Sequence, residues 1–414
     1  MSDAGGFSLT HGAHVGIGSL PIVLFGNAEQ KKKYLPKLAS GELIAAYALT
    51  EPGSGSDALG AKTIAKLNDA GTHYVLNENL LGEVGRGHVI AFNILNIGRY
   101  KLGVGTVGGS KRALELAIQY TNQRQQFKTK LSSFNLTKEK LATMAATLYA
   151  SESLNYRTVG YYDEVMSQLS EEQQKDPKAI AQAVAEYAIE CSIAKVFGSE
   201  TLDYIADEAV QLRIYRDSRI NRIFEGTNEI NRLIVPGTFM KKALKGELPL
   251  LKVAQDLQEE LLMLMPEEIS DEPLAQEKYL VKNAKKIGIL AAGIAAQRFG
   301  TKLEQEQEVL VNIANIANQI YAMESVVIRT AKAIERDGAE KAKQKILYAQ
   351  IFCQEAFGEI EKEAKETILA SADGDNGRIM LSALRKLTRY NPYNLILKKR
   401  EASEKLIEAE KYVV

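Results

Sequence analysis

The sequence predicts a mainly α-helical protein, and three observations carry this prediction. The chain has 414 residues but only 9 prolines, which suits long uninterrupted helices because proline breaks a helix. Apolar residues recur at helical spacing, with charged residues between them, over 137–169 and again over 178–211. A strand-like alternation is confined to Thr72–Val75, so we expect little β-structure.

The N-terminal part is expected to be a partial helical domain followed by a small β remnant. Residues 7–45 contain two short helical patterns, and Gly26–Glu29 is typical of a turn with a helix start. Residues 46–78 are rich in glycine and serine and include the strand-like run. We therefore expect a partial helical domain over 1–45 and a remnant of a β domain over 46–78.

Two larger helical regions follow. Between 79 and 245 the pattern predicts three or four long helices, and one of them begins at Asp176–Pro177 because proline suits the first turn of a helix. From Gly246–Pro249 onward the chain becomes rich in Glu, Lys and Ala, which is typical of amphipathic helices. We expect a helical bundle over 79–245 and an additional helical domain over 246–414.

Composition and charge argue against several classes of protein. Lys+Arg and Asp+Glu are both 52, which gives no general attraction to nucleic acid or to an anionic membrane. Cys191 and Cys353 form no CxxC pair, which argues against a disulfide scaffold and suits a reducing compartment. No signal peptide is visible, and the longest apolar stretch, 287–296, is too short to span a bilayer. The expected location is the cytoplasm, with peripheral membrane contact left open.

Several weak motifs are better explained by structure than by chemistry. Gly103–Gly108 matches a dinucleotide fingerprint letter by letter, but no buried strand precedes it, so we expect a helix whose glycines permit close packing. His11 and His14 lie three residues apart without a third ligand nearby, which favours a packing role over metal ligation. Asp373–Gly377 lacks the spacing of a calcium loop and is expected to be a helix–helix turn. No metal site is predicted.

Two segments are candidates for chemistry. Tyr47–Asp57 places hydroxyl residues and two glycines in a turn, which can present donors to phosphate or to ring acceptors; an ordinary surface turn is the alternative. In the second segment, Glu225 lies between Phe224 and Gly226. An apolar neighbour would raise the pKa of this carboxylate toward that of a general base. The alternative is a helix-start glutamate that accepts hydrogen bonds from backbone donors.

Four stretches, in a fixed order, together resemble the acyl-CoA dehydrogenase family. Tyr47–Ser56 resembles the family's TEPGSGSD signature, and Ile223–Ile230 resembles its YEGTxxI segment. Asn96–Tyr100 resembles the NxGR stretch of the long- and very-long-chain branch, and Arg124–Phe127 the RxxF motif. The tail is similar to the C-terminal extension of the very-long-chain members. The resemblance implies an acyl-CoA dehydrogenase-like helical bundle with a remnant of the central β domain and an additional C-terminal helical domain.

The resemblance also implies an FAD-dependent enzyme. The implied reaction is α,β-dehydrogenation of a long-chain fatty acyl-CoA to the trans-2-enoyl-CoA, the first step of fatty acid β-oxidation. Glu225 matches the family's base, which removes the proton α to the thioester carbonyl while the β-hydrogen leaves as hydride to the flavin. Some members place the base at the position that matches Gly98, where glycine cannot act. The backbone N–H of Glu225 would help to polarise the carbonyl.

Further site residues follow from the same resemblance. Arg99 would meet the CoA portion, Asn96 would lie near the pantetheine, and Arg124 would approach the FAD pyrophosphate of a neighbouring subunit. The residues expected to bind FAD are Tyr47, Leu49, Thr50, Ser56, Arg124, Phe127, Gln211, Thr227 and Glu229. The residues expected to bind substrate are Ser56, Asn96, Arg99, Phe224 and Gly226. The implied partners are an electron-transfer flavoprotein or similar acceptor, and further copies of the chain in a dimer or larger homo-oligomer.

The chain also departs from the family pattern. After Asn77 the family continues with GxKxWITN and most of a β-barrel, whereas here Glu78–Glu83 follows at once and resembles the far end of that domain. The family's xHGGxGF loop is missing after Gln211. Either these segments have been lost and flavin binding is weakened, or the sequence joins segments of a longer chain. The departures motivate a second hypothesis, a non-catalytic helical assembly or scaffold protein of dehydrogenase shape.

Overall fold

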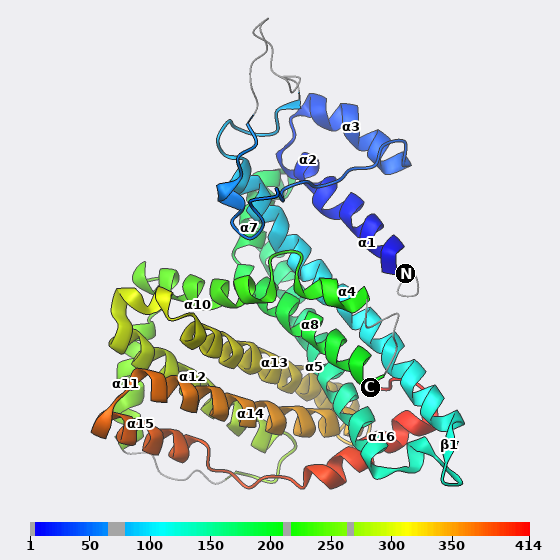
Figure 1. Ribbon diagram of the computed structural model, residues 1–414, viewed down its shortest axis with the longest axis vertical. Helices are drawn as coiled ribbons and strands as arrows, with labels where there is room; N and C mark the ends of the chain where they lie inside the picture. The colour runs from blue at the N-terminus through cyan, green and yellow to red at the C-terminus, as the bar shows by residue number, and fades with distance from the viewer. Residues whose placement is uncertain (1–4, 65–78, 210–216, 263–268) are drawn as a thin grey trace, which may run out of the picture.

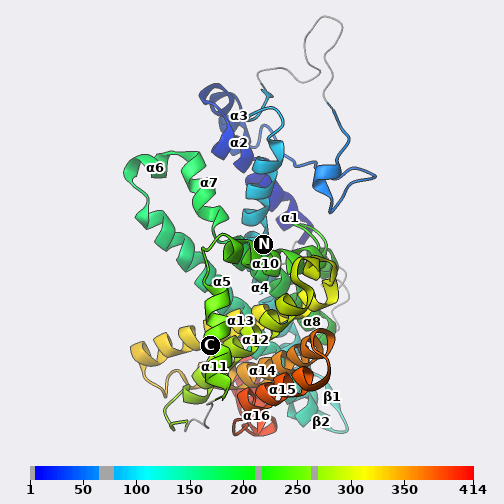
Figure 2. The ribbon, with the colours of Figure 1, turned by 90° about the vertical axis from the view of Figure 1, so that its left-hand side faces the viewer.

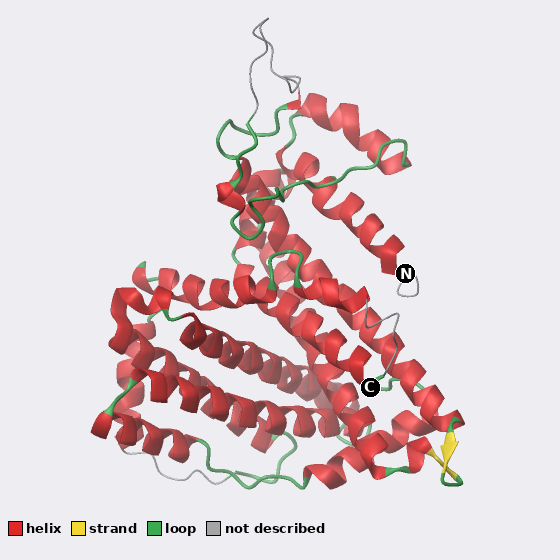
Figure 3. Cartoon of the chain, in the orientation of Figure 1, coloured by secondary structure: helices red, strands yellow, loops and turns green. Residues whose placement is uncertain are grey.

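A computed structural model describes residues 5–64, 79–209, 217–262 and 269–414. Figure 3 shows that most of these residues are helical, which confirms the mainly α-helical prediction. The sheet within the described residues is a two-stranded hairpin of Gln125–Gln126 (β1) and Thr129–Lys130 (β2). The sequence patterns did not predict this hairpin. The strand expected at Thr72–Val75 lies outside the described residues.

The N-terminal region folds as short helices at the upper end of Figure 1. They are α1 (Gly5–Ala13), a π-helical turn (His14–Gly18), α2 (Leu20–Phe25) and α3 (Ala28–Ser40). The predicted helix start is confirmed, because the side chains of Asn27 and Gln30 each accept a hydrogen bond from the other's backbone N–H, at 2.8 and 3.1 Å. The packing role of His14 is also confirmed. Its Nε2 lies 3.1 Å from the Leu38 carbonyl, and its Nδ1 accepts from the Ala45 N–H.

Long helices fill the region predicted as a bundle. They are α4 (Gly87–Gln123), α5 (Asn135–Gln168), α7 (Pro177–Ala185), α8 (Ala188–Glu208) and α10 (Asn228–Leu244), with the short α6 (Glu171–Lys175). The helix start at Pro177 is confirmed. The helical pattern over 178–211 is divided, because α7 ends at Ala185 and α8 begins only at Ala188.

Helices α4 and α8 cross so closely that glycine is required at the contact. A Cβ atom added to Gly103 would lie 2.9 Å from the Ala194 carbonyl oxygen. One added to Gly198 would lie 3.2 Å from the Gly103 Cα and 2.5 Å from Thr106 Oγ1. The predicted packing role is thus confirmed at Gly103. At Gly105 and Gly108 no described atom lies within 4 Å of the added Cβ, so these two glycines are not needed for this packing.

The C-terminal region is helical and fills much of the lower block of Figure 1. They are α11 (Leu250–Leu262), α12 (Ala275–Phe299), α13 (Gln307–Asp337), α14 (Lys343–Ser371), α15 (Gly374–Leu387) and α16 (Leu395–Ala409). The helix–helix turn expected at Asp373–Gly377 is shorter than predicted, because only Ala372 and Asp373 separate α14 from α15 and Gly374–Gly377 already belong to α15. Tyr149 of α5 and Tyr348 of α14 are both fully buried, with ring centroids 5.7 Å apart. One hydrophobic core therefore joins this region to the bundle.

Within the described ranges, no helix is both long and apolar enough to cross a membrane. In the same residues no cluster of three or more His, Cys, Asp or Glu side chains is arranged to hold a metal ion.

A buried carboxyl group at the start of α12 lowers the stability of the C-terminal region. Glu277 is fully buried, and neither of its carboxyl oxygens has a hydrogen-bond partner among the described residues. Burial raises the pKa of Glu277, while the nearby Tyr393 hydroxyl and Lys398 charge only partly oppose the rise. At pH values between the ordinary carboxyl pKa and this raised pKa, Glu277 therefore binds more protons in the folded protein than in the unfolded chain. This contribution makes stability fall as pH rises above the ordinary carboxyl range.

Glu277→Gln is accordingly expected to stabilise the protein at neutral and mildly alkaline pH, by about 1–3 kcal/mol. The gain should shrink as pH falls below the folded-state pKa, because the wild-type carboxyl group is then also neutral. Thermal unfolding midpoints across a pH series test this, with the exposed Glu366→Gln as the control. If the difference in unfolding midpoint between Glu277→Gln and the wild type did not change with pH, this account of Glu277 would be contradicted.

Candidate functional site

Glu225 lies in a strained loop between a 3₁₀ turn (Arg219–Arg222) and the start of α10. Its backbone φ is +61°, and Gly226 follows with φ +81°. A positive φ costs a non-glycine residue about 1–3 kcal/mol, and such strain is found most often where function requires it. Glu225 Oε2 is buried and has no hydrogen-bond partner among the described residues. One carboxylate oxygen is therefore available to a group that the described residues do not supply.

The Glu225 carboxylate rests directly on the backbone of α4. A Cβ atom added to Gly98 would lie 2.3 Å from Glu225 Oε2 and 2.6 Å from its Cδ. Such distances are far inside van der Waals contact, so only glycine leaves room for the carboxylate. In the sequence, Gly98 was informative only as a position that cannot carry a base. The structure gives this residue a second role, which is to make space for Glu225.

Arg99 and Asn96 of α4 join the Glu225 loop. Arg99 is buried, with 7% of its surface exposed, and donates from Nε to the Glu225 carbonyl at 3.1 Å and from Nη1 to Asn96 Oδ1 at 2.9 Å. Asn231 Nδ2 donates to the carbonyls of Glu225, Gly226 and Thr227 at 3.3, 2.8 and 3.1 Å. The loop carbonyls are thus fixed from two sides, which offsets the strain at positive φ. The roles of Arg99 and Asn96 toward CoA stay predictions.

The electrostatic surroundings of Glu225 suit a general base. Burial raises the pKa of Glu225 to about 7, and the positive charges of Arg99 and Lys195 oppose the rise. The Tyr47 hydroxyl is also buried without a hydrogen-bond partner among the described residues. Burial and the Glu225 charge together raise the pKa of Tyr47. The two segments chosen from the sequence therefore meet in space.

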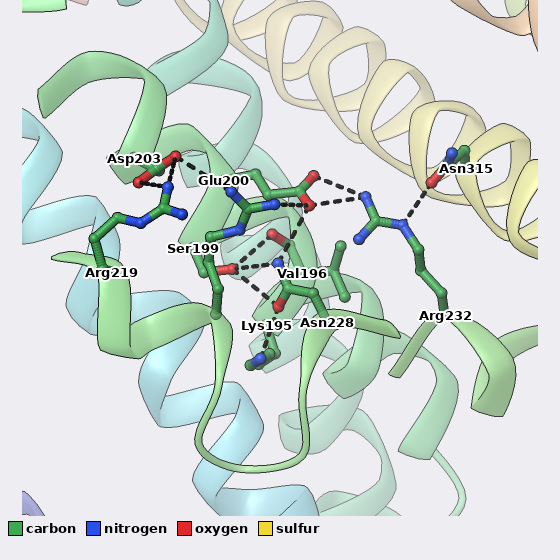
Figure 4. Close-up of polar contacts among 10 residues, drawn as sticks. Lys195, Val196, Ser199, Glu200, Asp203, Arg219, Asn228, Arg232 and Asn315 are labelled. Atoms are coloured by element: carbon green, nitrogen blue, oxygen red, sulfur yellow. Dashed lines mark hydrogen bonds and ion pairs between the residues drawn. The ribbon is translucent and has the colours of Figure 1, made fainter. Parts of the chain in front are cut away.

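A second set of buried polar groups supports the loop from α8, and the sequence patterns did not reveal it. Lys195 is fully buried and donates from Nζ to Asn228 Oδ1 at 2.7 Å. Asn228 Nδ2 donates to Ser199 Oγ at 3.1 Å and to Glu200 Oε1 at 3.2 Å. Figure 4 shows these side chains converging on Asn228. Lysine inside the apolar run Ile193–Phe197 was the available signal, because a charge in such a run is seldom buried without a partner.

Ion pairs extend this set outward along α8. Arg232 donates from Nη2 to both Glu200 oxygens at 2.8 and 2.9 Å, and from Nε to Asn315 Oδ1 at 2.7 Å. Arg219 donates to both Asp203 oxygens at 3.0 Å. Figure 4 shows Glu200 and Asp203 side by side on α8, each facing an arginine. The 3₁₀ turn and α10, which flank the Glu225 loop, are thereby both tied to α8.

The remaining candidates near the loop lie on two short segments. Thr227 caps α10, since its Oγ1 accepts from the Ile230 N–H at 3.3 Å. Glu229 is exposed, and hydrogen bonding to its own backbone N–H lowers its pKa. On the other segment Thr50 and Ser56 are exposed. Phe224, Gly226 and Leu49 are half-buried. The roles of these residues toward FAD or substrate stay predictions.

Two of the other cofactor-binding candidates, Arg124 and Phe127, do not reach this site within one chain. Arg124 ends α4, roughly 37 Å from Arg99 along the helix at 1.5 Å per residue. Phe127 sits in the β1–β2 hairpin, 91% exposed and with φ +50°. Figures 1 and 2 both show this hairpin at the end of the molecule opposite α1–α3. Gln211 lies outside the described residues. A role for Arg124 or Phe127 at a cofactor would require a second copy of the chain.

Comparison with protein families matches three parts of the chain. A model for the acyl-CoA dehydrogenase N-terminal domain covers residues 1–42. Two models for the acyl-CoA dehydrogenase C-terminal domain cover residues 85–237 and 283–386.

Individual relatives agree with these matches. A probable acyl-CoA dehydrogenase of Bacillus subtilis (strain 168) is 58% identical over 493 residues, covering 100% of this chain and 83% of that protein. The human mitochondrial very long-chain specific acyl-CoA dehydrogenase is 31% identical over 318 residues, covering 56% of this chain and 46% of that protein. A crystal structure of acyl-CoA dehydrogenase complexed with FAD from Bacillus anthracis matches with a TM-score of 0.97 and 59% identity, covering 100% of this chain and 84% of that one. The aligned span of the Bacillus subtilis protein exceeds the 414 residues of this chain, so that relative has residues without a counterpart here.

Proposed function

The chain belongs to the acyl-CoA dehydrogenase family, and from this membership we propose that it oxidises a long-chain fatty acyl-CoA to the trans-2-enoyl-CoA, the first step of fatty acid β-oxidation. The chain is a flavin-dependent oxidoreductase of acyl-CoA thioesters. The observation that carries the proposal is the Glu225 carboxylate, which is buried over Gly98 with one oxygen unpartnered among the described residues and a pKa raised to about 7.

FAD is the cofactor, and the residues around Glu225 fit it. Tyr47 and Glu225 each have a buried polar atom that is unpartnered among the described residues, and they lie close enough for the Glu225 charge to raise the pKa of Tyr47. Such atoms are expected where another molecule completes the hydrogen bonds. We assign the FAD contacts to Tyr47, Leu49, Thr50, Ser56, Thr227 and Glu229. Arg124 and Phe127 of a neighbouring copy would add contacts in a dimer or larger homo-oligomer. FAD, when bound, accepts the β-hydrogen of the substrate as hydride.

The chain's own residues carry out the proton transfer. Glu225 removes the proton α to the thioester carbonyl, and its backbone N–H donates to the carbonyl oxygen, where negative charge develops. Burial makes the carboxylate more basic, while Arg99 and Lys195 keep a useful fraction of it ionised. Asn231 and Arg99 hold the loop carbonyls, so the base does not have to be repositioned during the reaction.

A long acyl chain and an electron-transfer flavoprotein as acceptor are the finer parts of the proposal. The chain length rests on the Asn96–Tyr100 stretch and on the 31% identity to the human very long-chain specific enzyme. The acceptor rests on membership in the family. The test is kcat/KM for saturated acyl-CoA substrates of increasing chain length, with electron-transfer flavoprotein as acceptor. We expect the maximum at long chains. A maximum at short chains would contradict the chain-length assignment and leave the dehydrogenase assignment intact.

Lys195→Met is expected to shift the pH dependence of the reaction upward. In the wild type, kcat/KM should rise with pH through about 7 as Glu225 ionises. The Lys195 charge favours the ionised carboxylate, so its removal should raise the Glu225 pKa and move this limb up by roughly one pH unit. Lys343 is exposed and forms an ion pair with Glu401, so Lys343→Met serves as the control. A Lys195→Met variant that loses activity equally at all pH values would contradict the electrostatic role.

A further inference from the structure

A cavity of about 200 Å³ lies between α8, α10, α13 and α14. Three carboxylates line it, Glu200, Glu359 and Glu363, against the single guanidinium of Arg232. Figure 4 shows the wall formed by Glu200, Arg232 and Asn315. The proposed dehydrogenation assigns no role to this cavity.

The one arginine of the wall does not neutralise these carboxylates. Arg232 already donates to both oxygens of Glu200 and to Asn315. Glu363 receives a hydrogen bond from Asn315 Nδ2 at 3.1 Å, and Glu359 has only a 3.9 Å contact with the exposed Lys362. Burial raises the pKa of Glu363, and the negative charges of Glu366 and Glu359 add to this rise, while the Asn315 hydrogen bond and the Lys362 charge oppose it. The lining thus carries more negative than positive charge, which favours a cationic occupant.

Two buried carbonyl groups of α13 point to the kind of cation. Asn318, 5% exposed, lines the cavity, and its Oδ1 has no hydrogen-bond partner among the described residues. The Oε1 atom of Gln319, another lining residue, is buried and unpartnered in the same way. Buried acceptors without donors are costly, so an occupant that supplies N–H groups would be stabilised here. A primary ammonium group offers three such donors.

The rest of the lining is apolar. Val196, Phe197, Ile316 and Ile360 are buried and contribute to the cavity wall. A bare metal ion would gain nothing from these side chains, and no described cluster is arranged to hold one. A short alkyl chain would cover them. We propose that this cavity binds a small primary alkylammonium ion, with its ammonium group on Asn318, Gln319 and Glu363 and its alkyl chain on the apolar wall.

Calorimetric titration of the FAD-loaded protein with n-butylammonium chloride tests the proposal. Tetramethylammonium chloride at the same ionic strength controls for charge without N–H donors, and n-butanol controls for the alkyl chain without charge. We expect saturable binding of n-butylammonium, with tetramethylammonium and n-butanol each at least roughly tenfold weaker. No saturable binding would overturn the proposal and indicate a cavity that holds only water. Equal binding of the two ammonium ions would also overturn it, because the site would then respond to charge and not to N–H donors.

Two variants locate the site. Asn318→Leu removes the unpartnered carbonyl at similar size, and Glu363→Gln removes one charge. Each should weaken n-butylammonium binding roughly tenfold. If Asn318→Leu does not fold, binding by Glu363→Gln is the test of the site. Glu363 is only half-buried, so we expect this variant to fold. The matched control is Glu366→Gln, on the same helix but not part of the lining. Binding unchanged in Glu363→Gln, or equally weakened in Glu366→Gln, would overturn the assignment.

Discussion

Replacing Glu225 by glutamine is expected to lower kcat by roughly 10²–10⁴-fold, the usual contribution of a positioned general base. Glutamine has nearly the same shape and keeps the backbone that Arg99 and Asn231 hold, but it cannot accept the α-proton. FAD content and acyl-CoA affinity should therefore change little, so the loss falls on kcat rather than on KM.

Steady-state kinetics, together with the flavin-to-protein ratio, check this result. Glu335→Gln is the control, because Glu335 is exposed on α13 and is not one of the site residues. Its effect on kcat should be small. Near wild-type turnover by Glu225→Gln would show that another group is the base.

Gly98→Ala is expected to reduce kcat/KM by roughly 10²-fold, although the substitution adds only one methyl group. The new Cβ would lie 2.3 Å from the Glu225 carboxylate, so the carboxylate must move away from α4. A displacement of about 1 Å at a reacting group is enough for a loss of this size. Alanine has a higher helix propensity than glycine, so helix propensity gives no reason for the unfolding midpoint to fall.

Gly160→Ala on α5 is the control for Gly98→Ala, because no described atom lies within 4 Å of a Cβ added there. It should retain full activity. The combined variant with Glu225→Asp, whose side chain is one methylene shorter, should recover part of the activity lost by Gly98→Ala. Unchanged kinetics in Gly98→Ala would contradict the placement of the Glu225 carboxylate on α4.

Local sequence signals predicted the helix starts that residues close together in the sequence determine. The capping residues Asn27 and Gln30 fixed the start of α3, and Pro177 fixed the start of α7. The break between α7 and α8 at 186–187 has no proline or glycine to mark it. The 125–130 hairpin is too short to show a strand pattern. Both therefore escaped prediction from apolar spacing.

The residues of the candidate site also fall into two groups, those that a local sequence motif reveals and those that only tertiary packing brings together. Glu225 was found because its apolar neighbour and its resemblance to a family motif are visible within a few residues. Its partner Arg99 is 126 positions away, and the space made by Gly98 depends on how α4 packs against the loop. Lys195 and Asn228, 33 positions apart, become a buried pair only when α8 meets α10. Such contacts are set by tertiary packing, which periodicity does not reveal.

The central claim is that this chain is an FAD-dependent acyl-CoA dehydrogenase with Glu225 as its base. The most direct test is anaerobic addition of a long-chain acyl-CoA to the purified protein, with the visible flavin absorbance followed over time. The account predicts a yellow protein whose flavin band bleaches as one equivalent of trans-2-enoyl-CoA forms, and a bleaching rate that collapses in Glu225→Gln. A colourless protein, or a flavin band that acyl-CoA leaves unchanged, would contradict it.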